Sequence, residues 1–269
     1  MGSRETQTLV ALFCAIPLLG AVLAVGDVRR WLRGNGSIKQ TLSNASVGLL
    51  FLAIQLVLRG ALLAAYAAVA ALVPWKLPDG IAVYLVAFVL LDGVYYVQHR
   101  LEHAVPILWA IHAVHHQSLD YNLSVSLRVG ALSALSTLLF HFLLALAGVS
   151  VKTYALVVTI HAALLFGLHA RTKLTLGPGR FVNAPVFHRV HHGADLASID
   201  KNFGGVFLVF DRAFGTFAPY VGDPSFGVVG AGVVDDPLTA NVAPMAQLAA
   251  TVRAQPTLGK KLRALFARS

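Results

Sequence analysis

Long runs of hydrophobic residues, separated by short polar segments, dominate the first two thirds of the chain. Residues 8–26 and 130–148 carry no charge, and residues 46–75 carry only Arg59. A helix needs roughly 20 apolar residues to cross the hydrocarbon core of a bilayer, and each of these runs is about that long. The pattern therefore predicts membrane-spanning helices. We place them at about residues 8–26, 46–74, 80–97, 130–148 and 151–170.

The second of these spans is unusually long. As a helix it would extend about 43 Å, more than the roughly 30 Å of a bilayer core. It must therefore tilt, or break near Arg59 and Gly60, and we expect one tilted helix. The first span is too long, and has too few basic residues before it, for a typical cleaved signal peptide, so we expect it to remain as a span.

The composition supports the same class of protein. The chain is 57% hydrophobic and only 12% charged, whereas soluble domains carry about 25% charged residues. The sequence thus predicts an all-α integral membrane protein with about five transmembrane helices. The net charge of +9 does not indicate a nucleic-acid partner, because the basic residues flank the spans and form no groove interleaved with aromatic residues.

Histidine is concentrated in three short boxes. They read HRLEH at 99–103, HAVHH at 112–116 and HRVHHG at 188–193, and they hold eight of the eleven histidines. From composition alone, a match to HxxHH is expected about 0.02 times in a chain of this length, yet two occur. The boxes therefore call for a common explanation.

The order of spans and boxes predicts that all three boxes lie on one side of the membrane. Residues 130–148 and 151–170 form a hairpin, with two boxes before it and the third after it. A hairpin of the second and third spans places the basic segment 27–45 on the same side. Because cytoplasmic loops are rich in Lys and Arg, we expect a histidine-rich cap on the cytoplasmic face of a multi-pass protein.

Histidines three or four residues apart project from one face of a helix, so each box presents a cluster of imidazoles. Eight rings are more than one tetrahedral site can use, which predicts two metal ions. Imidazole suits iron, zinc, copper and nickel, so the ligand type leaves the metal open. The boxes contain no cysteine and few acids, unlike structural zinc sites and carboxylate di-iron bundles.

The boxes and their flanks resemble the fatty acid hydroxylase and sterol desaturase superfamily over about residues 90–217. Asp92 and a Tyr-Tyr pair precede the first box, Tyr-Asn follows the second, and DKNFGG (200–205) and DRAFGTF (211–217) follow the third. The resemblance implies two iron ions that use O2 to attack an unactivated C–H bond of a fatty acyl, sterol or related lipid. The product would arise by hydroxylation, ether cleavage or desaturation, and zinc could replace iron in purified samples.

Under this resemblance the metal ligands number nine. The family usually adds a histidine at the end of the last span, and His169 stands there. Some members carry one more histidine where this chain has Leu165, and an aromatic residue is common where it has Gln98. We expect no catalytic side chain beyond the ligands themselves. The expected ligands are His99, His103, His112, His115, His116, His169, His188, His191 and His192.

Ligation by histidine alone would leave a high positive charge, which neighbouring acids would offset while orienting the rings. The candidates for this role are Asp92, Asp200 and Asn202, with Asp120 and Asp195 as further acids.

Two histidines lie outside this set. His161 precedes His169 by two helical turns, about 12 Å, which is too far to bind the same ion. It could line a substrate cavity or be structural, and His141 is expected to be structural or interhelical.

The expected electron donor is a separate reductase, ferredoxin or cytochrome, because the chain has no flavin, haem or iron–sulfur motif. We divide the chain into N-terminal spans with a basic loop (1–89), a catalytic region (90–220) and a C-terminal cap (221–269). The cap ends in a basic amphipathic segment, of the kind that tends to lie on a membrane surface. Its apolar face comprises Leu258, Leu262, Leu265 and Phe266.

Two other functions are considered. A membrane metal transporter would place its histidines at the bilayer midplane on broken helices. A membrane zinc hydrolase would use fewer ligands and a glutamate in an HExxH motif, which this chain lacks. The position and number of the boxes favour the oxygenase over both.

Overall fold

The computed structural model describes residues 24–173, 175, 181–232 and 234–267. Within these residues the fold is all-helical, and β pairing is limited to isolated bridges between Val182 and Phe207 and between Gly193 and Phe226. The first predicted span lies almost entirely outside the described residues.

Three helices are long and apolar enough to cross a membrane, judged by length and composition: α2 (Ile38–Leu72), α3 (Ile81–Ala104) and α6 (Val151–Leu168). The predicted span at 130–148 forms α5 (Ser133–Leu146), which is apolar but only 14 residues long. A helix of that length extends about 21 Å, short of a bilayer core of roughly 30 Å. The number of crossings therefore stays a prediction.

Helix α2 is continuous through Arg59 and Gly60, as expected of one long helix. Its first turn is capped by Ser37, whose side chain accepts a hydrogen bond from the backbone N–H of Gln40 (3.1 Å). Because α2 begins at Ile38, and residues 24–32 are also helical, the polar connection between the first two spans is shorter than the predicted segment 27–45.

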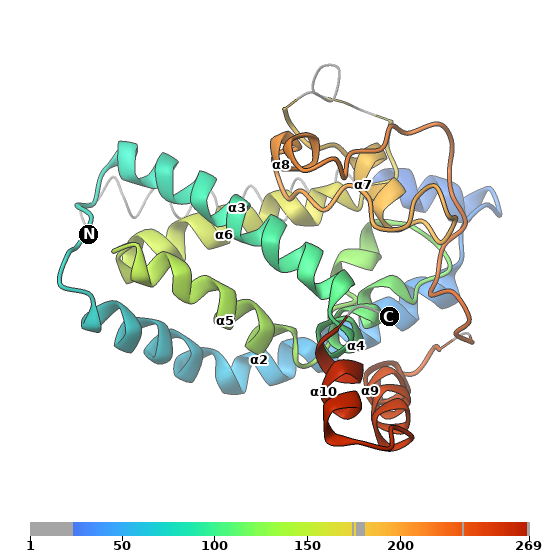
Figure 1. The fold of residues 1–269 in the computed structure, drawn as a ribbon. Helices are drawn as coiled ribbons and strands as arrows, with labels where there is room; N and C mark the ends of the chain where they lie inside the picture. The colour runs from blue at the N-terminus through green and yellow to red at the C-terminus, as the bar shows by residue number, and fades with distance from the viewer. Residues whose placement is uncertain (1–23, 174, 176–180, 233, 268–269) are drawn as a thin grey trace.

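The long helices α2, α3, α5 and α6 lie side by side and form one end of the molecule (Figure 1). Their core includes Tyr66, which stacks on Tyr154 with ring centroids 4.0 Å apart and donates a hydrogen bond to the carbonyl of Val149 (3.1 Å). His141 Nδ1 lies 2.8 Å from the Tyr154 hydroxyl, in agreement with a structural, interhelical role. The outward faces carry exposed leucine and valine, as expected of helices surrounded by lipid.

The other end of the molecule is a cap of short helices (Figure 1). Helix α3 ends at Ala104, and α4 (Pro106–His116) begins two residues later and packs back against it. Proline suits the first turn of a helix, since its missing N–H would be unpaired there. This reversal brings the first two histidine boxes together. The remaining elements are η1 (Leu123–Leu127), α7 (Pro185–His191), α8 (Val209–Ala213), α9 (Pro237–Arg253) and α10 (Leu258–Phe266).

A buried arginine joins the cap to the bundle. Arg128 is 0% exposed, and its guanidinium donates to the carbonyl of Val114 (2.8 Å), to Ser43 Oγ (2.9 Å) and to Gln117 Oε1 (2.7 Å). A further bond reaches the carbonyl of Val234 (3.1 Å). One side chain therefore connects α2, α4 and the segment that leads into α9.

Replacing this arginine should loosen the whole cap. Arg128→Met leaves several buried acceptors unpaired, at a cost of about 3 kcal/mol. For a chain of this size that corresponds to a fall in Tm of roughly 5 °C, measurable by thermal unfolding in detergent. Arg253→Met, at an exposed position of α9, is the control, and equal Tm values for the two variants would show that Arg128 is not the link described.

Candidate metal centre

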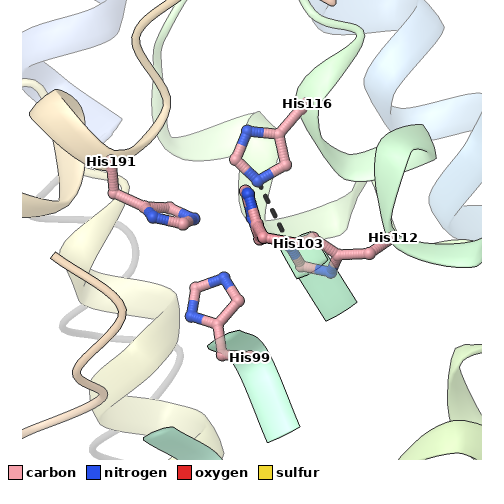
Figure 2. A group of neighbouring side chains, drawn as sticks. All are labelled: His99, His103, His112, His116 and His191. Atoms are coloured by element: carbon pink, nitrogen blue, oxygen red, sulfur yellow. Dashed lines mark hydrogen bonds between the residues drawn. The ribbon is translucent and has the colours of Figure 1, made fainter. Parts of the chain in front are cut away.

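Five histidines from three helices form a first cluster, which we call site A. His99 and His103 project from the last turns of α3, His112 and His116 from α4, and His191 from the end of α7. Each offers a ring nitrogen, and these nitrogens all lie within 4.8 Å of one another. Figure 2 shows the five rings turned toward a common centre.

The other four predicted ligands form a second cluster, site B. It contains His115 of α4, His169 just after α6, and His188 and His192 at α7. The Nε2 atoms of His115 and His169 are 3.1 Å apart, those of His169 and His188 are 3.1 Å apart, and those of His188 and His192 are 3.3 Å apart. All nine predicted ligands are therefore gathered into two clusters.

The two clusters adjoin. The rings of His116 in site A and His192 in site B stack with centroids 4.4 Å apart. His115 and His116 are neighbours in sequence yet belong to different sites, as are His191 and His192. Sites A and B are thus two parts of one centre at the junction of the bundle and the cap.

The donor set fits metal ions. Four nitrogens about 2.1 Å from a tetrahedral ion are about 3.4 Å apart, close to the spacing in site B. Several buried ring nitrogens have no hydrogen-bond partner among the described residues, which is costly unless an ion binds them. In site A these atoms are His99 Nε2, His103 Nε2 and His191 Nε2.

Backbone carbonyls set the orientation of the rings. The Nδ1 atoms of His99, His115 and His191 each lie 2.9 Å from a carbonyl oxygen. An N–H at Nδ1 that donates to a carbonyl leaves the lone pair on Nε2, the atom directed into the cluster. The carbonyls belong to Phe203, Arg128 and Lys201 respectively.

His169 is held in the same way by the turn before it. Its Nδ1 lies 3.2 Å from the carbonyl of Leu165. The residue that replaces an additional histidine of some family members thus contributes its backbone to the site.

Two acids face rings of site A. Glu102 Oε2 is 3.3 Å from His112 Nδ1, and Asp200 Oδ1 is 3.8 Å from His103 Nδ1. Glu102 is fixed by Gln98 (3.0 Å) and by Ser136 of α5 (2.8 Å). Asp200 was a predicted partner of the rings, whereas Glu102 was not. The sequence signal for Glu102 was its position inside the first box. It lies on the side of α3 that α4 covers after the chain reverses.

Asp92 forms hydrogen bonds with backbone N–H groups rather than with one of the nine rings. It is fully buried, lies 2.7 Å from His161 Nε2, and accepts hydrogen bonds from the N–H groups of Val206 (2.6 Å) and Phe207 (3.0 Å). A Cβ on Gly205 would collide with this carboxylate and with the His161 ring, so only glycine allows the approach. Asp92 and His161 together anchor the segment that carries the Phe203 carbonyl.

Asn202, another predicted partner, also binds backbone. Its side-chain amide donates to the carbonyls of Phe187 (3.0 Å) and Ala218 (2.8 Å) and accepts from the Ala218 N–H (2.8 Å). Asp200 and Asn202 both adopt positive φ, 58° and 55°, which aspartate and asparagine tolerate better than most residues. The turn between them presents the Lys201 carbonyl to His191.

Three further acids form their hydrogen bonds or ion pairs with groups other than the histidine rings. Asp120 binds Arg30 (2.9 Å), and Asp195 accepts from the N–H of Ser225 (3.0 Å), so neither contacts the predicted ligands. Asp211, which the sequence analysis did not single out as a ligand partner, accepts from the N–H groups of Phe203 (2.8 Å) and Gly204 (2.7 Å). Burial raises the pKa of Asp211 despite these bonds.

Burial also determines the charge of the rings in the cap. It lowers the pKa of His115 from its usual value to about 4. Burial, together with the repulsion among neighbouring rings, holds the pKa of the other cap histidines well below the usual value. At neutral pH these rings are uncharged and present a free lone pair, the form that binds metals. They are His112, His116, His169, His188, His191 and His192.

Site A opens into a cavity of about 410 Å³ that is lined by His103, His116, His191 and Asp200. Trp109 forms part of the same wall, with its ring centroid 5.0 Å from that of His103 and 5.7 Å from that of His116. Trp109 therefore lies directly against the rings of site A.

The comparisons with known proteins agree with this geometry. The profile of the fatty acid hydroxylase family matches residues 84–216, a range that includes all nine rings. The chain belongs to the fatty acid hydroxylase family. Comparison with solved structures gave no match.

Curated relatives carry lipid-oxidising activities in their names. The chain is 34% identical to an alkylglycerol monooxygenase of Danio rerio over 214 residues, which cover 76% of this chain and 47% of that protein. It is 39% identical to the Homo sapiens alkylglycerol monooxygenase over 145 residues, 54% of this chain and 32% of that protein. An ornithine lipid hydroxylase of Rhizobium tropici is 27% identical over 150 residues, 50% of this chain and 42% of that protein. The chain thus spans less than half the length of these curated relatives.

The metal-free protein should lose stability steeply as the pH falls below neutral. In an unfolded chain the imidazole pKa is about 6.5, so the unfolded state takes up protons first and is favoured increasingly from there down to the folded pKa, about 4 for His115. Each such ring contributes about 1 kcal/mol per pH unit within that window. The measurement is the Tm of chelator-treated protein at pH 7.5, 6.5 and 5.5. A Tm that stays constant over this range would contradict the burial of neutral rings.

Proposed function

We propose that the protein is a membrane-bound, O2-dependent lipid hydroxylase that holds one iron ion at site A and one at site B. The observation that carries this proposal is the gathering of nine buried imidazoles into two adjoining clusters at one end of a bundle of apolar helices. Imidazole also suits zinc, copper and nickel. Membership of the fatty acid hydroxylase family favours iron among them.

The overall reaction defines what the chain must provide. Hydroxylation converts R–H, O2, two electrons and two protons into R–OH and water. Bound iron would supply the redox chemistry that activates O2. The two electrons come from an external donor, a reductase, ferredoxin or cytochrome, because the sequence carries no motif for a second redox group. The monooxygenase and hydroxylase names of the relatives favour hydroxylation over desaturation.

The chain's own residues position and protect the reacting groups. Carbonyls of Phe203, Arg128 and Lys201 fix three rings, and Glu102 Oε2 lies 3.3 Å from His112 Nδ1. Burial excludes bulk water from the rings, which limits side reactions. Site A is the part of the centre that borders the 410 Å³ cavity, so we assign the oxidised C–H bond to that side.

The orientation in the membrane forms part of the proposal. We propose five crossings, with the cap in the cytoplasm, because basic residues precede α2 at the capped end of the bundle. The substrate would be a lipid with a polar headgroup and a long alkyl or acyl chain, entering from the bilayer. The clusters lie at the ends of the described helices rather than midway along them, which argues against the transporter.

The metal content of purified protein tests the centre directly. Anaerobic loading with ferrous iron should give two irons per chain by elemental analysis. His103→Ala and His188→Ala should each retain about one iron, because each removes a ring from a different cluster. His141→Gln, outside both clusters, should keep two. A parent protein that binds no more than one metal ion would contradict the two-site centre.

Oxygen incorporation tests the reaction. With an alkylglycerol as substrate and a chemical or protein reductant, ¹⁸O2 should label the product at the oxidised carbon. Glu102→Gln weakens the support of His112 and should lower turnover about 10- to 100-fold, while His141→Gln should stay near the parent rate. Label that comes from water instead of O2 would exclude an oxygenase.

A further inference from the structure

A second, larger cavity lies on the far side of α4 from the metal centre. Its volume is about 1140 Å³, and it is lined by α4, α9, α10, residues 228–232 and Val234. The wall on α4 is formed by Trp109, Ala110 and Ala113, and α9 adds Leu248. The wall on α4 is therefore apolar, while Gln247, Thr251 and Gln255 add polar side chains from the opposite side.

The rim of this cavity is cationic. Lys260 and Arg263 of α10 line it, and no acidic side chain of the described residues does. Neither Lys260 nor Arg263 forms an ion pair with a carboxylate in the described parts of the chain. The two charges thus face a space in which the described residues place no counter-charge.

Helix α10 is turned so that its cationic side lines the open cavity. Ala264 and Ala267 line the cavity beside the two cations, while Leu258, Leu262 and Phe266 on the opposite face are 72%, 48% and 57% exposed. A soluble protein would reverse this arrangement. At the capped end of a membrane bundle, an outward apolar face suits the acyl region of the bilayer and leaves the inner side at the level of the headgroups.

The large cavity adjoins the one at site A. Both are lined by Pro106, Trp109, Val228 and Val229. Trp109 contacts His103 and His116 on one side and faces the larger cavity on the other. A molecule seated at Lys260 and Arg263 would therefore direct its tail toward the metal centre.

We infer that the cavity behind α10 binds an amphiphile with an anionic headgroup, with the headgroup at Lys260 and Arg263 and the alkyl chain against Trp109 and α4. Charge complementarity, the apolar wall on α4 and the outward apolar face of α10 all support this occupant. Two sources share the chemistry: an anionic membrane lipid that resides in the cavity, and an anionic substrate on its way to site A.

Fluorescence quenching tests the binding site without reference to catalysis. Trp31→Phe and Trp75→Phe leave Trp109 as the reporter. The protein is placed in phosphatidylcholine nanodiscs that contain chain-brominated phosphatidylglycerol or chain-brominated phosphatidylcholine. Half-maximal quenching should need about tenfold less of the anionic lipid.

Matched variants separate a defined site from general attraction to a basic surface. In Lys260→Gln/Arg263→Gln, the two lipids should quench equally. Arg253→Gln/Lys261→Gln removes the same charge from positions at the end of α9 and on α10 that do not line the cavity, and should keep the preference. Ala264→Phe, which fills the cavity without changing charge, should weaken quenching by the anionic lipid. Equal quenching in the parent, or equal loss in both double variants, would overturn the inference.

A turnover assay separates the two sources, and this arm alone rests on the proposed function. Single-chain ether lipids with a phosphate or a phosphocholine headgroup are compared. If the phosphate lipid is hydroxylated and Lys260→Gln/Arg263→Gln raises its KM with little change in kcat, the occupant is substrate. If it quenches Trp109 but is not oxidised, the occupant is a resident lipid. If no lipid is turned over, the proposed function is contradicted, while the quenching result still stands.

Discussion

The hydrogen bond from an imidazole Nδ1 to a backbone carbonyl is the interaction on which the centre depends. It decides which nitrogen carries the proton and where the other one points. The three carbonyls lie outside the long helices, so other hydrogen bonds must fix the position of each. Arg128 holds its own segment through its buried guanidinium, and Asp211 and Asp92 hold the segment around Phe203. Much of the polar network in the cap therefore fixes the positions of these three carbonyl oxygens.

This network also explains why charged groups occur inside an apolar molecule. Buried Asp92 and Asp211 accept several N–H donors, and Arg128 donates to several acceptors, so each is compensated by hydrogen bonds. Such groups contribute little net stability compared with apolar packing, but each is costly to remove once its partners are fixed. They determine the conformation of loops that would otherwise have many alternatives.

Much of the candidate site could be predicted from the sequence, because helical spacing alone places i, i+3 and i+4 rings together. The division into two clusters could not. Within the second box, His112 and His116 join site A while His115 joins site B, which depends on how α4 meets α7 in the fold. The carbonyl partners escaped prediction for another reason: every residue has a carbonyl, so side-chain identity does not reveal which one is used. Asp92 was predicted to support the ligand rings, yet it supports them only through a loop.

For the fold, the length of the apolar runs indicated α2, α3 and α6. Helix α5 is shorter than its apolar run, because that run continues into turns at both ends.

The adjacent histidines His115–His116 and His191–His192 have a consequence for the geometry of the centre. In each pair, one ring belongs to each cluster, so the clusters are tied together twice by a single peptide unit. Consecutive Cα atoms are about 3.8 Å apart, a length that no domain motion can change. The two halves of the centre therefore cannot move apart as separate bodies, because two dipeptides each contribute a ring to both.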